Sequence, residues 1–145
     1  MSKLFKLIIF IFLFLNFSNL LMADSSFFKE GKKKYDKKQY NESKFLFQRS
    51  IVFDPKNEKS YLYLAKIFNF EKNKKEEEKN ISTVLLLDPK NEEAMYMLME
   101  IELAKSNYSK VKTLIETFSD VCNILCDKKV SILDSLKNLE PKNES

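Results

Sequence analysis

The tetrapeptide Asp-Pro-Lys-Asn occurs at Asp54–Asn57 and again at Asp88–Asn91, each time directly after an apolar run. The distance from Pro55 to Pro89 is 34 residues. Proline cannot continue a helix, because it lacks an amide hydrogen and its ring clashes with the preceding turn, and the asparagine that follows suits the start of another helix. A signal of this kind repeated at this distance predicts an architecture of helical repeats.

Counting backward from the two prolines divides the chain into units, each of two helices joined by a short turn. In the third unit Asn123 replaces the closing proline. Apolar residues in Asp127–Leu139 fall close to one helical face, so we predict a helix at 126–140 that caps the last repeat, followed by a tail at 141–145. The three predicted repeats are 24–57, 58–91 and 92–125.

These units resemble the tetratricopeptide repeat (TPR). That repeat has a large apolar residue at its fourth position, small residues at the eighth, twentieth and twenty-seventh, an aromatic residue at the eleventh and proline at the thirty-second. The first unit supplies Phe27, Gly31, Tyr40, Ser43, Phe47, Ser50 and Pro55. The second supplies Tyr61, Leu64, Ala65, Phe68, Ile81, Val84 and Pro89. The third supplies Met95, Leu98, Tyr108, Val111, Ile115 and Phe118. The departures are Glu30, Lys34, Glu77, Met99 and Glu102.

The resemblance implies an all-α fold, a right-handed superhelical solenoid of helix-turn-helix repeats with a C-terminal capping helix. Repeats of this family stack around a concave groove lined by the first helix of each unit. The groove-facing positions correspond here to Phe28, Lys32, Lys59, Leu62, Lys66, Asn69, Tyr96, Glu100 and Leu103. Aromatic side chains around a basic patch would suit an extended or helical peptide with an acidic group or a C-terminal carboxylate. The alternative is that Leu62 and Tyr96 only pack against neighbouring helices.

The N-terminal sequence has the three regions of a secretory signal peptide. Two lysines precede an uninterrupted apolar run at Leu7–Leu15, and polar residues then dilute it before Ala23. We expect cleavage after Ala23, which would remove residues 1–23 and leave a periplasmic or secreted protein. The alternative is an uncleaved anchor in the inner membrane, facing the periplasm, because Leu4–Met22 approaches the roughly 20 residues that a spanning helix needs.

The charge pattern gives little support for nucleic-acid binding. The chain has 25 Lys and Arg against 21 Asp and Glu, a net charge of +4. Lysine runs occur at Lys29–Lys38 and Lys72–Lys79, but the second contains Glu76–Glu78, and Arg49 is the one arginine of the sequence. Phosphate binding usually recruits arginines in a stripe of one sign. We therefore interpret both runs as solvated faces and expect no nucleic-acid partner.

Cys122 and Cys126 are the only cysteines in the sequence. In an oxidising compartment they could close a short loop between the third repeat and the capping helix, which is worth about 2 kcal/mol on the chain-entropy model. Two separate thiols are the alternative. A metal site is disfavoured, because the sequence has no histidine and no further thiol to complete the coordination.

Enzymatic chemistry has little basis in this sequence. Without histidine a Ser or Cys nucleophile lacks its usual base, and the one glycine, Gly31, excludes the glycine-rich loops that hold phosphates. We therefore expect a protein that is not an enzyme and takes no cofactor. Our hypothesis is an exported scaffold or adaptor that binds another protein of a bacterial envelope complex in its groove. The alternative is a structural subunit that stacks on itself or on a larger repeat protein.

Overall fold

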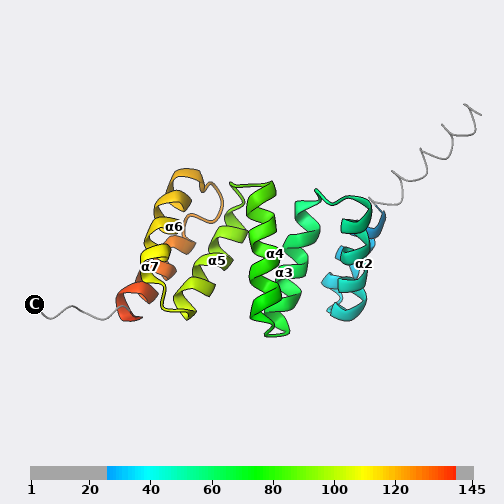
Figure 1. Ribbon diagram of the computed structural model, residues 1–145, viewed down its shortest axis with the longest axis horizontal. Helices are drawn as coiled ribbons and strands as arrows, with labels where there is room; N and C mark the ends of the chain where they lie inside the picture. Colours follow the sequence, from blue (N-terminus) through cyan, green and yellow to red (C-terminus); the bar gives the residue numbers. More distant parts are fainter. Residues whose placement is uncertain (1–25, 140–145) are drawn as a thin grey trace, which may run out of the picture. The chain divides into compact units, whose positions relative to one another are not determined.

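The computed structural model describes residues 26–139, and all of the regular structure in that part of the chain is helical (Figure 1). The predicted signal peptide and C-terminal tail lie outside the described residues. The chain divides into two compact units between Leu64 and Ala65, inside α3. The first helix covers residues 26–36, and it is followed by α2 Tyr40–Phe53, α3 Glu58–Phe70, α4 Lys74–Leu87, α5 Glu92–Ala104, α6 Tyr108–Val121 and α7 Lys128–Leu139.

The repeated tetrapeptide begins with the same turn at both of its positions. Directly after α2, the Asp54 Oδ1 accepts a hydrogen bond from the Lys56 amide at 3.0 Å. Directly after α4, the Asp88 Oδ1 accepts one from the Lys90 amide at 3.2 Å. An aspartate that binds the backbone two residues later holds a turn and so competes with continuation of the helix.

The tetrapeptide also ends in the same way, with an asparagine that caps the next helix. The Asn57 Oδ1 accepts a hydrogen bond from the Ser60 amide at 3.0 Å, at the start of α3. The Asn91 Oδ1 accepts one from the Ala94 amide, also at 3.0 Å, at the start of α5. Such a cap stabilises a helix by about 1 kcal/mol, because it satisfies an amide that has no partner within the helix. The tetrapeptide thus ends one helix and starts the next, as the sequence predicts.

A second periodic feature lies in the turn between the two helices of each pair. Lys38, Lys72 and Ser106 have φ angles of 60°, 60° and 59°, and 34 residues separate each from the next. This left-handed conformation costs a residue other than glycine roughly 1 kcal/mol. The amide of the following residue closes the turn, as Asn73 does by donating to the Phe68 carbonyl at 2.9 Å. The third turn therefore keeps the phase of the first two.

The first unit brings its helices together through small residues. A Cβ at Gly31, in the first helix, would lie 2.9 Å from the Phe47 Cε1 and 3.3 Å from the Leu46 Cβ, both in α2. The Ser43 hydroxyl donates a hydrogen bond to the Gly31 carbonyl at 2.9 Å. Phe47 is fully buried at this contact. The two backbones can approach this closely because position 31 has no side chain.

The second unit has a larger apolar core, built mainly on α5. In Figure 1, α5 lies beside α4, α6 and α7, and residue contacts join α5 to each of them. The capping helix α7 covers this core with Ile132 and Leu136, and the Tyr108 hydroxyl donates a hydrogen bond to the Leu139 carbonyl at 2.8 Å. The buried residues of the core are Met95, Met99, Leu103, Val111, Ile115, Phe118, Ile132 and Leu136.

Glu77, a departure from the repeat pattern in α4, is buried with its carboxylate hydrogen-bonded. Its side chain is 1% exposed. Its Oε1 accepts a hydrogen bond from the Asn69 Nδ2 at 2.6 Å, and its Oε2 accepts one from the Lys74 Nζ at 2.9 Å. Burying a carboxylate is tolerated when hydrogen bonds and an opposite charge replace water. The second unit therefore joins α3 to α4 through a polar contact, where the family pattern has a small residue.

Glu102 of α5 is a second buried carboxylate, and like Glu77 it accepts hydrogen bonds from one asparagine and one lysine. Its Oε2 accepts a hydrogen bond from the Asn107 Nδ2 at 2.9 Å, and its Oε1 accepts one from the Lys110 Nζ at 2.8 Å. Burial raises the pKa of Glu102, but these two hydrogen bonds and the charges of Lys110 and Lys105 outweigh burial and hold the pKa below its ordinary value. The group is therefore ionised at neutral pH.

Candidate interaction surface

The predicted groove residues of the first unit have packing partners of their own. Phe28 lies with its ring centroid 5.8 Å from that of Phe47 and 5.9 Å from that of Tyr63. Lys32 forms an ion pair with Asp36 at 3.1 Å, and the hydrogen bond to Asp36 raises the pKa of Lys32. Phe28 is thus half-buried in an aromatic cluster.

Tyr63, on α3, is the centre of that cluster, and sequence reasoning missed it. Its ring stacks on Phe47 with centroids 5.0 Å apart, and it meets Tyr35 edge-on, also at 5.0 Å. The groove residues that were predicted on this part of α3 are Leu62, which is half-buried, and Lys59, which is exposed. The cluster combines helices from different parts of the chain, so no local spacing pointed to Tyr63.

Two of the predicted groove residues, Lys66 and Asn69 in the second unit, are already bonded to carboxylates of neighbouring helices. The Lys66 Nζ lies 2.8 Å from the Glu93 Oε1, which joins α3 to α5. Asn69 donates its amide hydrogen bond to the buried Glu77. An anionic ligand at Lys66 would have to compete with the Glu93 carboxylate. Lys66 and Asn69 would therefore bind an acidic group only weakly.

A different group of side chains is brought together where α5 and α7 meet. The Tyr96 hydroxyl donates a hydrogen bond to the Glu100 Oε1 at 2.7 Å. The Lys128 Nζ lies over the Tyr96 ring, 5.7 Å from its centroid. The hydrogen bond to Glu100 and burial raise the pKa of the Tyr96 phenol, against an opposing contact with Ser131. We call Tyr96, Glu100, Lys128 and Ser131 the α5–α7 surface.

The sequence predicted half of this surface. Tyr96 and Glu100 were found through the repeat pattern, whereas Lys128 and Ser131 come from the capping helix, which the pattern does not cover. Leu103 was also predicted to face the groove, but it is 8% exposed and belongs to the core of the second unit. Its side chain therefore packs inside the protein, and we leave it out of the α5–α7 surface.

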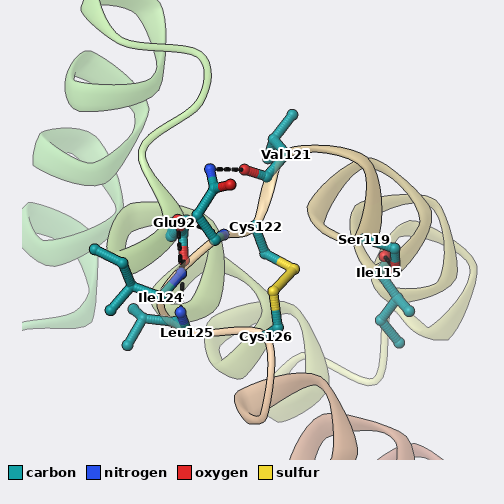
Figure 2. The surroundings of a disulfide bond; sticks show 9 residues. Glu92, Ile115, Ser119, Val121, Cys122, Ile124, Leu125 and Cys126 are labelled. Carbon is teal, nitrogen blue, oxygen red and sulfur yellow. Dashed lines mark hydrogen bonds between the residues drawn. A yellow bond between two sulfur atoms is a disulfide. The ribbon is translucent and has the colours of Figure 1, made fainter.

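Cys122 and Cys126 form a disulfide bond, with their Cα atoms 5.3 Å apart, in the segment between α6 and α7 (Figure 2). The loop that they close points its backbone amides at one carboxylate, that of Glu92 at the start of α5. The Glu92 oxygens accept hydrogen bonds from the amides of Asn123 at 2.8 Å, Ile124 at 3.0 Å and Leu125 at 2.6 Å.

The hydrogen bonds from these backbone amides lower the pKa of the Glu92 carboxyl group. The hydrogen bond from the Leu125 amide does most to lower the pKa of Glu92, and with those from Asn123 and Ile124 it outweighs the opposing effect of desolvation. A carboxylate that accepts several backbone amides is stabilised in its charged form. Because α7 begins directly after this loop, Glu92 and the disulfide together fix where the capping helix starts relative to α5.

Neither a metal site nor a membrane-spanning helix is found in the part of the chain that the structure describes. Within residues 26–139, no three His, Cys, Asp or Glu side chains gather in a way that could hold a metal ion. No helix in the same range combines the length and the apolar character that crossing a bilayer requires.

Comparison with known proteins identifies the fold. No protein-family model matches the chain, and no curated protein does. Solved structures do match. The chain is similar to the TPR domain of Arabidopsis OM64, with a TM-score of 0.71 and 16% identity over 82% of this chain and 98% of that one.

Two further matches are structures of complexes. The TPR2B domain of yeast Sti1, in a pHsp70 complex, has a TM-score of 0.72 and 14% identity, covering 82% of this chain and 99% of that one. The second TPR domain of human RPAP3, in complex with the HSP70 peptide SGPTIEEVD, has a TM-score of 0.68 and 19% identity, covering 81% and 98%. The chain therefore has the TPR fold, and the predicted all-α, TPR-like class is confirmed.

Proposed function

We propose that this protein is an exported adaptor that binds a peptide or helix of another envelope protein. The observation that carries the proposal is the α5–α7 surface on a TPR fold. TPR domains of the same fold have been solved with bound peptides, including the human RPAP3 domain with an HSP70 peptide and the first TPR of Spaghetti (RPAP3) with an HSP90 peptide. A fold built from stacked helix pairs offers a rigid frame for such binding.

The chemistry of the α5–α7 surface suggests what kind of segment it would take. The Tyr96 ring is partly exposed and can cover an apolar side chain. Charges of both signs adjoin it, because Glu100 accepts the hydrogen bond from its hydroxyl and Lys128 lies over the ring. Tyrosines of this kind often anchor interfaces, because one large rigid side chain buries much area at little entropic cost. We therefore expect a partner segment with an apolar anchor flanked by charges of both signs.

The proposed location outside the cytoplasm rests on the N-terminal sequence and is supported by the disulfide. The apolar run at Leu7–Leu15 has the form of a signal peptide core. Disulfides such as Cys122–Cys126 persist in oxidising compartments and are rare in the cytosol.

A reporter fusion tests this location directly. Residues 1–30 are fused to an enzyme that is active only after export, and the matched control carries Phe10→Asp, which interrupts the apolar run with a charge. We expect activity from the unchanged sequence and a strong loss of activity from the control. An inactive fusion of the unchanged sequence, made in normal amounts, would contradict export.

The binding proposal is tested by photo-crosslinking in the native envelope. A crosslinking amino acid is placed at Tyr96, and in a second strain at Thr113, an exposed residue of α6. We expect a specific partner to be captured from position 96 and not from position 113. Capture of the same proteins from both positions, with both proteins folded by circular dichroism, would contradict binding at the α5–α7 surface.

A second candidate function is a subunit that stacks on copies of itself, and one observation favours it. The capping helix α7 exposes Val130 at 61%, Leu133 at 41% and Leu139 at 54%. Apolar residues on a terminal helix of a repeat protein are a surface on which a further repeat can stack. Sedimentation over a range of concentrations tests this alternative: a mass that rises with concentration, and that Leu133→Glu returns to the monomer value, would support it.

A further inference from the structure

Three lysines of the first helix and the turn after it, Lys29, Lys33 and Lys37, are spaced four residues apart and so follow one side of the helix. We call them the basic row. They line a shallow hollow of about 520 Å³ on the first unit. The other lining residues of the hollow are Ser26, Glu30 and Lys34.

The basic row differs from the other lysines of its region, because it lacks neutralising partners within residues 26–139. Its neighbour Lys34 forms an ion pair with Glu42. In the second lysine run, Lys74 is likewise matched by Glu77. No ion pair joins a member of the basic row to another described residue, and Glu30 is the one acid in the lining of the hollow. The side chains of the row therefore present net positive charge to the solvent.

An exposed aromatic residue borders the same surface. A second hollow, of about 460 Å³, shares Glu30 and Lys34 with the first and extends to Phe45 on α2. Phe45 is 57% exposed, and the Arg49 guanidinium lies 5.8 Å from its ring centroid. Glu42, the ion-pair partner of Lys34, also lines this second hollow, so the cation recorded beside the Phe45 ring is Arg49 and the basic row lies in the adjoining hollow. An exposed aromatic ring next to basic side chains lets a surface bind the headgroup region of a bilayer, where the ring enters the interface.

The sequence before the first helix brings this surface within reach of a membrane. Lys29 follows Met22, the last residue of the apolar segment Leu4–Met22, by seven residues. Seven residues span at most about 25 Å when fully extended. When the apolar segment is in a bilayer, the connecting residues therefore keep Lys29, the first residue of the basic row, within about 25 Å of the end of that segment.

We propose that the basic row and Phe45 form a docking surface for a membrane that contains anionic lipids. The lysines bind the phosphate-bearing headgroups and the Phe45 ring enters the interface between headgroups and acyl chains. Each lysine near an anionic surface strengthens binding by roughly fivefold. Nucleic acid fits the surface less well, because it offers no apolar layer for Phe45 to enter.

The absence of tryptophan from the sequence provides a direct test. The full chain carrying Phe45→Trp is reconstituted into nanodiscs of phosphatidylcholine, with or without phosphatidylglycerol, in both cases with brominated acyl chains that quench tryptophan. The matched control is Phe70→Trp, at a residue that is 63% exposed on α3 in the second unit. The apolar N-terminal segment is present in every sample, so its own insertion cannot produce a difference.

We expect quenching of Phe45→Trp in the anionic discs, little quenching in the neutral discs, and little quenching of Phe70→Trp in either. Replacing the basic row by glutamine in the Phe45→Trp chain should abolish the quenching. Equal quenching of the two tryptophans, quenching that does not depend on the anionic lipid, or quenching that survives loss of the basic row would overturn the proposal. An emission shift of Phe45→Trp with single-stranded DNA but not with anionic discs would also overturn it.

Discussion

The two units join their helix pairs with opposite chemistry. In the first unit the helices touch at Gly31, where an added Cβ would lie 2.9 Å from the ring of Phe47, and the Ser43 hydroxyl adds a hydrogen bond to the Gly31 carbonyl. In the second unit the pairs meet around the buried carboxylates of Glu77 and Glu102, which accept hydrogen bonds from asparagine and lysine side chains.

The difference shows what each contact demands of the sequence. A contact of small residues allows no added volume, because the neighbouring atoms are already at van der Waals distance. A buried carboxylate has volume to fill the space between two helices, but it requires donors at defined positions. The same fold therefore tolerates a departure such as Glu77, provided that Asn69 and Lys74 accompany it.

The largest effect is expected for Gly31→Leu in the first unit. A single Cβ there would already meet Phe47 at 2.9 Å, so a leucine forces the two helices apart. We expect the free energy of unfolding to fall by about 3 kcal/mol in urea denaturation. Lys33→Leu, an exposed position on the same helix, is the control and should change stability by no more than about 0.5 kcal/mol. Equal effects of the two substitutions would refute the close contact.

The next effect is expected from removing the disulfide of the second unit. Cys122→Ser with Cys126→Ser should lower the free energy of unfolding by about 2 kcal/mol, because a short loop is no longer closed in the unfolded chain. Reducing the wild-type protein should lower its stability to the same value. The double variant should not respond to the reductant, and any response would show that the reductant acts elsewhere.

A smaller loss is expected for Glu102→Gln, which keeps the shape of the side chain but removes its charge. The hydrogen bond from Lys110 then no longer joins opposite charges, and we expect a loss of about 1.5 kcal/mol at pH 7. Glu116→Gln, on the exposed side of α6, is the control and should be close to neutral. A loss of the same size at Glu116 would mean that burial of Glu102 is not the cause.

The pH dependence of stability in the wild type and in Glu102→Gln is a further test of the buried carboxylate. Folding lowers the pKa of Glu102, so the ionised side chain contributes fully to the free energy of unfolding above the ordinary glutamate pKa of about 4.3. This contribution is lost as the pH falls through the pKa of Glu102 in the folded protein. The stability difference between wild type and Glu102→Gln should therefore shrink below about pH 4.3. Melting curves recorded between neutral and acid pH measure it. A difference that stays constant would show that Glu102 is not bound as its ionised form.

The smallest effect is a gain, expected for Lys72→Gly in the turn before α4. Lys72 has a φ of 60°, which glycine adopts without steric cost. We expect the free energy of unfolding to rise by up to about 1 kcal/mol. Lys79→Gly, inside α4, should instead lower it by about 1 kcal/mol, because glycine weakens a helix interior. A loss at both positions would contradict the left-handed turn.

The helical repeats could be predicted from the sequence because their signals are local. The turn at Asp54, the cap at Asn57 and their copies one repeat later are each held by bonds that span two or three residues. The same spacing identified the repeat pattern and, through it, Tyr96 and Glu100.

The features that sequence reasoning missed depend on residues far apart in the chain. Glu92 accepts hydrogen bonds from three backbone amides that lie 31 to 33 positions later in the chain, and no residue close to Glu92 in the sequence indicates them. Lys128 reaches the Tyr96 ring only because the disulfide loop turns the chain back toward α5. The neutralisation of Lys66 by Glu93 was missed for the same reason.

Binding of a partner at the α5–α7 surface can be measured as an affinity, using the protein captured by crosslinking. Isothermal titration calorimetry would compare wild type, Tyr96→Ala and the control Thr113→Ala. We expect binding about 30-fold weaker for Tyr96→Ala, as for other aromatic interface anchors, and unchanged for Thr113→Ala. Equal affinities for all three proteins would contradict binding at this surface.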